Sequence, residues 1–141
     1  MTAGTPAGDL VRAFGDVQRM AARYAPGIEW QMPKSTPFPR PIVGRDAVVA
    51  FNRKVWREVH RPDCEVEILD EVGDGEASAV RFLYRAFVFS HGRIYENEYT
   101  VFTRSGAEGL TKVFEAFDTV TALDFYRGDQ TRMRGFDEDR S

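Results

Sequence analysis

The sequence is poor in the residue types that hold metals or form disulfides. Cys64 is the only cysteine, and the 141 residues include two histidines. A single cysteine excludes a disulfide within the chain and fits a reducing compartment. The cysteine and the histidines show no recognisable metal-ligand spacing, so we predict no metal site. We expect His91 in a tight turn and His60 at a helix end, exposed to solvent or in contact with the helix dipole.

Long apolar runs and an excess of basic charge are also missing. No stretch of ~18 apolar residues could span a bilayer, and the first residues lack the basic start and apolar core of a secretion signal. The formal net charge is -3, and the arginines are scattered among acidic residues, which argues against a nucleic-acid scaffold. We therefore expect a soluble, cytoplasmic protein that binds neither nucleic acid nor a membrane.

The composition is that of a globular protein with the size of one domain. Hydrophobic residues make up 43% of the chain and aromatic residues 13%, which is enough to form a sizeable core. We expect residues 1–8 to be a disordered N-terminus, residues 9–126 to form one domain and residues 127–141 to be a flexible polar tail.

Apolar spacing predicts two helices in the first half of the chain. Residues 9–24 have the period of an amphipathic helix, with Asp9 placed to cap it and a Pro-Gly pair following it. Residues 45–60 have the same period and end before Pro62. Between the helices we expect a short strand over 28–32, followed by a stiff proline-rich loop over 33–41 that is placed to rim a pocket.

Alternating apolar and polar residues predict four long strands in the second half, followed by a short helix. The strands cover residues 64–72, 77–89, 93–104 and 109–118. This order of elements predicts an α+β fold, in which helices lie on one side of a curved antiparallel sheet that forms the floor of a cavity.

Three carboxylates lie in the last two strands, which are rich in Phe and Tyr: Glu98, Glu115 and Asp118. An ionised carboxylate is costly to bury among aromatic rings, so it is solvated, paired with a cation, or held near neutrality by a raised pKa. The third condition is the one that enzymes use to make a general acid or base.

Glu98 has a candidate partner across the hairpin. If His91 and Gly92 are the two loop residues, Arg85 faces Glu98. One interpretation is a surface ion pair worth ~0.2–1 kcal/mol. The other is that the face carrying both charged and apolar residues lines the cavity, where the pair orients a polar group of a substrate.

The direction of the other two carboxylates is open. Glu115 shares a strand face with Phe117, whereas Asp118 lies on the opposite face. Both can point into one cavity only if the strand bulges or ends between them. Asp118 and Thr119 can equally cap the terminal helix.

The order of elements and two sequence segments resemble the SnoaL-like branch of the nuclear transport factor 2-like superfamily. These segments are GRDAVVAF at the start of the second helix, and YENEYTVF followed by GLTKVFEAFDT. The resemblance covers about residues 9–126, and its most specific part is an N-E-Y strand followed by a strand that ends in E-x-F-D. It implies a cone-shaped fold, with a bent sheet around a deep pocket closed by N-terminal helices, and frequently a homodimer through the outer face of the sheet.

The resemblance also implies a range of functions. Members include polyketide cyclases, ketosteroid isomerases, dehydratases and epoxide hydrolases, together with binding domains that catalyse nothing, so the fold does not decide the function. We predict an isomerase, cyclase or dehydratase that needs no cofactor and acts on a small hydrophobic metabolite with a carbonyl group. The alternatives are a module of the same fold that binds a hydrophobic ligand or mediates dimerisation, and an adaptor for a partner protein.

The resemblance suggests Asp118 as the general acid or base. We expect Arg85, with Glu98 or Tyr99, to hold the developing enolate or hydroxyl. The predicted substrate-binding residues are Trp30, Phe51, Trp56, Tyr99, Glu115 and Phe117.

Overall fold

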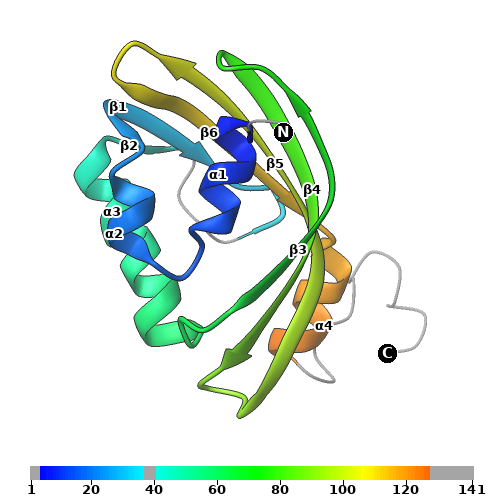
Figure 1. Cartoon of the computed structure of the whole chain (residues 1–141). Helices are drawn as coiled ribbons and strands as arrows, with labels where there is room; N and C mark the ends of the chain where they lie inside the picture. Colours follow the sequence, from blue (N-terminus) through cyan, green and yellow to red (C-terminus); the bar gives the residue numbers. More distant parts are fainter. Residues whose placement is uncertain (1–3, 37–40, 128–141) are drawn as a thin grey trace.

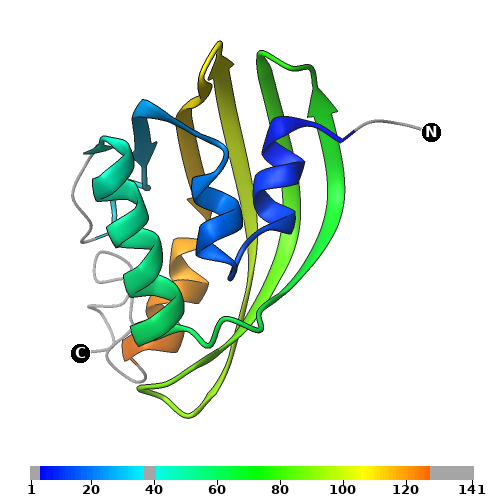
Figure 2. The ribbon, with the colours of Figure 1, turned by 60° about the vertical axis from the view of Figure 1, so that its left-hand side comes forward.

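A single curved sheet, with helices along one of its faces, forms the body of the protein (Figures 1 and 2). The computed structural model describes residues 4–36 and 41–127. The sheet has six strands in the order β2-β1-β6-β5-β4-β3. The strands are β1 (Tyr24–Gln31), β2 (Ile42–Val43), β3 (Glu65–Gly73), β4 (Ala77–Val88), β5 (Arg93–Gly106) and β6 (Gly109–Phe117). The helices are α1 (Pro6–Arg12), α2 (Val17–Ala21), α3 (Arg45–Arg53), its π-helical continuation η1 (Lys54–Val59), and α4 (Thr119–Arg127).

The predicted α+β fold with a curved sheet is confirmed, with one difference in strand direction. β1 runs parallel to β6, with Trp30 beside Val113, whereas the other neighbouring strands are antiparallel. The sheet is therefore mixed. The parallel pair joins the first long strand to the last strand, which brings Trp30 next to Glu115, the carboxylate of β6.

The prediction of one helix over residues 9–24 is wrong, because the chain turns at Gly15. Its φ is +93°, and a Cβ there would lie 2.2 Å from the carbonyl oxygen of Pro62. Only glycine takes this conformation so close to another backbone at low cost. The next residue, Asp16, then begins a new helix, because its side chain accepts a hydrogen bond from the backbone N–H of Arg19 at 3.1 Å.

The first helix begins inside the segment predicted to be disordered. The Thr5 hydroxyl caps α1 by accepting a hydrogen bond from the N–H of Gly8 at 3.0 Å. Glu71 of β3 in turn accepts hydrogen bonds from both the backbone N–H and the hydroxyl of Thr5, each at 2.7 Å. These contacts fix the start of α1 on the sheet. Residues 1–3 and 128–141, which belong to the predicted disordered ends, and residues 37–40 of the proline-rich loop lie outside the described residues.

The β4–β5 hairpin differs from the predicted register by two residues. Residues 89–92 connect the strands, so Leu83 faces Glu98 and Arg85 faces Glu96. The predicted pairing of Arg85 with Glu98 is wrong. A shift of two residues leaves each side chain on its predicted face, because strand side chains alternate with a period of two.

The two faces of the hairpin have opposite environments. The aromatic and aliphatic face, which includes Phe82, Tyr84 and Tyr95, is buried. The face carrying Arg81 and Arg85 is the outer one, so the prediction that this mixed face lines the cavity is wrong. Its charges form exposed ion pairs between strands, such as those of Arg85 with Glu96 at 2.6 Å and Glu65 at 3.3 Å, and of Arg81 with Glu98 at 3.2 Å and Asp70 at 2.7 Å.

Several large apolar side chains remain exposed on the outer face of the sheet. Ile94 is 44% exposed, Phe102 37% and Phe114 43%. The homodimer expected through this face stays a prediction.

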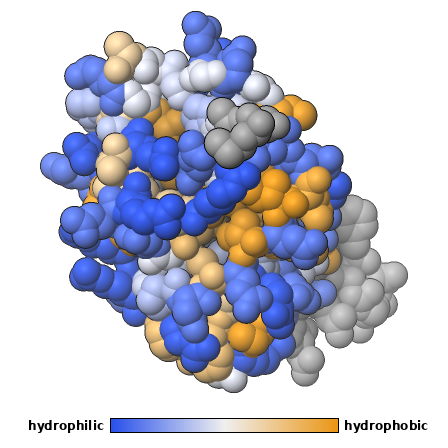
Figure 3. Space-filling view, in the orientation of Figure 1, coloured by the Kyte–Doolittle hydropathy of each residue, from blue (hydrophilic) through white to orange (hydrophobic). Residues whose placement is uncertain are grey.

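On the face of the molecule seen in Figure 3, hydrophilic residues predominate and surround a smaller hydrophobic cluster. Within the described residues, no helix has both the length and the apolar character needed to cross a membrane.

Candidate functional site

The helices and the inner face of the sheet enclose a cavity of about 930 Å³. This volume lies in the range of small-molecule sites, roughly 300–1,000 Å³. Aromatic side chains form much of its wall: Phe14, Trp30, Phe51, Trp56, Tyr84, Tyr95, Tyr99, Phe117 and Tyr126. The titratable groups other than tyrosine that line it are Glu115 and His60, which are buried, and Lys54 and Arg127, which are exposed.

A widened helical turn helps to shape this wall. After α3 the chain continues as the π-helical segment η1, in which Trp56 has the non-helical angles φ -101° and ψ 18°. Such π-helical turns are rare and often occur at functional sites. The irregular turn places Trp56 on the cavity wall, where this residue is 5% exposed. His60 follows directly after the π-helical segment.

Glu115 is the buried carboxylate of the cavity. It lies on the inner face of β6 and is 8% exposed. The indole Nε1 of Trp30 donates a hydrogen bond to its Oε1 at 3.1 Å. Burial raises the pKa of Glu115 from 4.5 to about 7, and the hydrogen bond from Trp30 opposes this rise only in part. No ion pair involving Glu115 occurs among the described residues, so its charge has no cation to neutralise it.

A buried amide also lines the cavity. The hydroxyl of Tyr24 donates to Oδ1 of Asn52 at 2.6 Å. Asn52 is fully buried, and its Nδ2 has no hydrogen-bond partner among the residues the structure describes. Burial and, secondly, the charge of Glu115 raise the pKa of Tyr24 well above 10, so this group lies within electrostatic reach of the carboxylate. An unpaired buried donor costs ~1–3 kcal/mol, which a ligand oxygen would recover.

A chain of hydrogen bonds crosses another part of the cavity. Nε1 of Trp56 donates to the hydroxyl of Tyr84 at 2.9 Å, and this hydroxyl contacts Nδ1 of His60 at 2.6 Å. Nε2 of His60 contacts the hydroxyl of Tyr126 on α4 at 2.5 Å. His60 lies at a helix end as predicted, but the first of its two predicted roles, solvent exposure, is wrong, since it is 6% exposed. Burial lowers its pKa from 6.5 to about 4, so its ring is neutral at pH 7.

A third network joins two tyrosines of β5. Nδ2 of Asn97 donates to the hydroxyl of Tyr95 at 2.7 Å and to the backbone oxygen of Asp118 at 2.9 Å. The hydroxyls of Tyr95 and Tyr99 lie 2.9 Å apart. Burial raises the pKa of Tyr95 to about 12 and raises the pKa of Tyr99 as well. Both hydroxyls therefore stay protonated near pH 7 and serve as hydrogen-bond donors rather than bases.

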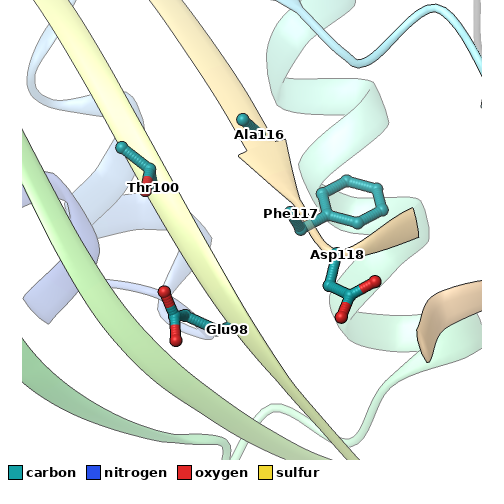
Figure 4. Close-up of a pocket in the computed structure, with 5 residues that line it drawn as sticks. All are labelled: Glu98, Thr100, Ala116, Phe117 and Asp118. Atoms are coloured by element: carbon teal, nitrogen blue, oxygen red, sulfur yellow. The ribbon is translucent and has the colours of Figure 1, made fainter. Parts of the chain in front are cut away.

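The three residues predicted to be catalytic do not line the cavity. Glu98 and Asp118 line a second, more open pocket of about 330 Å³, shown in Figure 4 with Glu98 on β5 and Asp118 just beyond the end of β6. Asp118 is exposed and caps α4: its Oδ1 accepts from the N–H groups of Val120 at 3.1 Å and Thr121 at 3.2 Å. The predicted alternative, a helix cap, is thus confirmed, and Arg85 lies on the outer face of the sheet.

The residues predicted to bind substrate, in contrast, meet in one place. All of them line the large cavity: Trp30, Phe51, Trp56, Tyr99, Glu115 and Phe117. Their role in binding stays a prediction. The sequence argument missed Asn52, His60, Tyr84 and Tyr126. Only Tyr84 carried a signal, because it belongs to the uncharged face of the hairpin, which is the buried one.

Comparisons with known proteins agree with this architecture. A family model described as a SnoaL-like domain matches residues 10–113. No curated protein matches the sequence. Among solved structures, an NTF2-like protein of unknown function from Burkholderia pseudomallei is 22% identical, with a TM-score of 0.67 over 84% of this chain and 90% of that one.

Two further solved structures have names that mention a reaction. A candidate isomerase from Rhodopseudomonas palustris is 20% identical, with a TM-score of 0.71 over 85% of this chain and 91% of that one. A candidate SnoaL-like polyketide cyclase from Jannaschia is 12% identical, with a TM-score of 0.66 over 82% and 87% of the two chains. At these identities the likeness lies in the fold.

Proposed function

Since the chain belongs to the SnoaL-like domain family, we propose that it is an isomerase, cyclase or dehydratase that needs no cofactor and moves a proton on a small, hydrophobic substrate bearing a carbonyl group. One observation carries the proposal: Glu115 is a buried carboxylate in the wall of a largely aromatic cavity, and it has no cationic partner in the described part of the chain. The proton-transfer role that the resemblance suggested for Asp118 is therefore proposed for Glu115.

The pKa of Glu115 suits it to both directions of proton transfer. At a pKa of about 7, the carboxylate and the carboxylic acid are both populated near neutral pH. The carboxylate takes a proton from the carbon next to the carbonyl; the C–H electron pair forms a C=C bond, and the carbonyl oxygen takes the charge as an enolate. The same proton returns to a different carbon in an isomerisation, or to a leaving hydroxyl in a dehydration. In a cyclisation the enolate carbon attacks a second carbonyl, and the resulting alkoxide takes the proton.

Asn52 supports an oxygen-bearing substrate. Its unpaired Nδ2 is a donor without a protein acceptor among the described residues, and the Tyr24 hydroxyl holds the other end of the amide. A substrate carbonyl that accepts from Nδ2 gains most as negative charge develops on its oxygen, because hydrogen bonds to charged groups are the stronger ones. The names of two structural neighbours mention an isomerase and a polyketide cyclase, reactions of this class, although each name belongs to that protein.

The test uses a general substrate for proton abstraction beside a carbonyl. The full chain is incubated with 2-tetralone in D2O, and exchange of the protons between the carbonyl and the aromatic ring is followed by NMR. Glu115→Gln is compared with Glu98→Gln, a matched change on the exposed outer face. We expect the wild type and Glu98→Gln to accelerate exchange equally, with a rate that rises as pH passes about 7. Glu115→Gln should lose at least ~100-fold, the scale of a general base.

Equal rates in Glu115→Gln and the wild type would contradict the proposal. A wild type no faster than buffer, but able to bind 2-tetralone, would contradict it too and would favour the alternative, a module that binds a hydrophobic ligand without chemistry.

A further inference from the structure

We propose that the Tyr126 hydroxyl donates a hydrogen bond to an acceptor oxygen of the bound substrate, and that Trp56, Tyr84 and His60 are positioning residues that fix the direction of this donation. The inference deepens the proposed function and rests on it for the cavity being the substrate site. It adds a second polar position, on α4, to the one formed by Glu115 and Asn52.

The proposal starts from an unbroken chain of short contacts. It runs from Trp56 to Tyr84 at 2.9 Å, from Tyr84 to His60 at 2.6 Å and from His60 to Tyr126 at 2.5 Å. All four side chains line the cavity. These residues come from η1, β4, the end of η1 and α4. Residues far apart in the sequence therefore form one polar line in a largely aromatic wall.

The buried hydroxyl of Tyr84 sets the direction of the whole chain. An indole N–H can only donate, so the oxygen of Tyr84 accepts from Trp56. Tyr84 is 2% exposed, and its own O–H therefore needs a protein acceptor. Nδ1 of His60 is that acceptor. The neutral ring then carries its proton on Nε2 and donates it to the oxygen of Tyr126.

The reverse direction leaves a buried donor without a good acceptor. If His60 carried its proton on Nδ1, Tyr84 would accept from both His60 and Trp56. The remaining contact of the Tyr84 O–H among the residues the structure describes would then be the sulfur of Cys64, which is a weak acceptor. Leaving a buried hydroxyl poorly paired makes this arrangement about tenfold rarer, or more. In the favoured direction the free donor is Tyr126, which is only half-buried and can reach a ligand.

The donation has a consequence for the substrate. The oxygen of Tyr126 already accepts from His60, and its O–H has no acceptor among the described residues. A hydroxyl that accepts one hydrogen bond becomes a better donor in the next. The site therefore favours a substrate with a second acceptor oxygen, in addition to the reacting carbonyl: a hydroxy- or dicarbonyl compound rather than a simple ketone.

The direction of the chain is tested by the tautomer of His60, measured by long-range ¹H–¹⁵N NMR at pH 7 on the full chain. There are two histidines, so His91→Gln assigns the signals. We expect His60 to be neutral, with its proton on Nε2. In Tyr84→Phe, which removes the hydroxyl that donates to Nδ1, the population with the proton on Nδ1 should rise about tenfold. A wild-type ring with its proton on Nδ1, or an unchanged tautomer in Tyr84→Phe, would overturn the proposal.

Binding of a second oxygen is tested with pairs of probes of similar size. Affinities of the ring-methoxylated 2-tetralones are compared with those of the ring-ethylated ones, for the wild type and Tyr126→Phe. We expect at least one methoxy isomer to bind the wild type about tenfold tighter than its ethyl counterpart, and Tyr126→Phe to remove this preference. A preference that survives in Tyr126→Phe, or one that no isomer shows, would refute the second site. These measurements do not depend on turnover. The second binding position can therefore be refuted while Glu115 still catalyses exchange, and it can be supported while Glu115→Gln exchanges as fast as the wild type.

Discussion

Replacing Glu115 with glutamine should stabilise the protein at high pH and leave it nearly unchanged at low pH. Burial raises the pKa of Glu115 from 4.5 to about 7, so the folded state binds this proton more tightly than the unfolded state. The stability that the group contributes is fully present below pH 4.5 and is lost as pH rises through 7. A shift of this size corresponds to about 3 kcal/mol. Glutamine has nearly the same shape and keeps an oxygen for Nε1 of Trp30, but it does not ionise.

The assay is urea unfolding followed by tryptophan fluorescence, for both proteins between pH 4 and pH 8. We expect the free energy of unfolding of Glu115→Gln to exceed that of the wild type by up to about 3 kcal/mol at pH 8, with the difference shrinking toward zero at pH 4. His60 acts in the opposite sense: its pKa is lowered from 6.5 to about 4, so its contribution is lost as pH falls through this range. It is present in both proteins and cancels in the difference.

Glu98→Gln is the matched control, because it makes the same chemical change on the exposed face of the sheet. Its difference from the wild type should stay below ~1 kcal/mol throughout the range. A Glu115→Gln difference that does not vary with pH, or a wild type that is the more stable protein at pH 8, would show that burial does not raise the pKa of Glu115.

Three further substitutions test the fold around the site. Asp118→Ala should lower the free energy of unfolding by about 1 kcal/mol through loss of the α4 cap, without changing exchange of 2-tetralone. Gly15→Ala should lower it by about 1–3 kcal/mol, because the added Cβ meets the carbonyl oxygen of Pro62, and urea unfolding measures the loss. Hydrogen bonds from Arg12 and Thr5 lower the pKa of Glu71 to about 2, so the advantage of the wild type over Glu71→Gln should be present above pH 4.5 and disappear as pH falls toward 2.

The strand faces could be predicted from the sequence, but the partners across the hairpin could not. Alternation assigns each residue to a face, and an error of two residues in register leaves the faces intact. Alternation therefore puts Tyr84 and Arg85 on opposite faces, as the structure does, while the predicted partner of Arg85 is wrong. The error came from the connection, which has four residues where two were assumed, and from taking the charged face for the cavity face.

Only part of the position of Glu115, the buried acid, could be predicted from the sequence. Strand parity put Glu115 and Asp118 on opposite faces, but parity alone does not say which face is inside. The answer depends on tertiary contacts: β1 places Trp30 beside β6, and its N–H reaches Glu115. The burial of His60 could not be predicted for the same reason, because its partners Tyr84 and Tyr126 are 24 and 66 residues away along the chain.

The break in the predicted first helix has a local cause, Gly15, which the spacing of the apolar residues does not reveal. The spacing of Leu10, Phe14 and Val17 fits one helical face, yet Gly15 between them takes a positive φ. The close approach of Pro62, which favours glycine there, comes from a segment far along the chain. Periodicity therefore identified the buried residues correctly, since Leu10 and Phe14 are both in the core, and failed only in the path of the backbone.

The proposed role of Glu115 as acid and base depends above all on its pKa in the folded protein. It is measured in the full chain with ¹³C-labelled glutamate by following the carboxyl carbon against pH, and Glu115→Gln identifies the signal by its loss. We expect a titration midpoint of about 7. An ordinary midpoint near ~4.3 would mean that the carboxylate is solvated or paired in solution, and would contradict its role as the acid and base of the cavity.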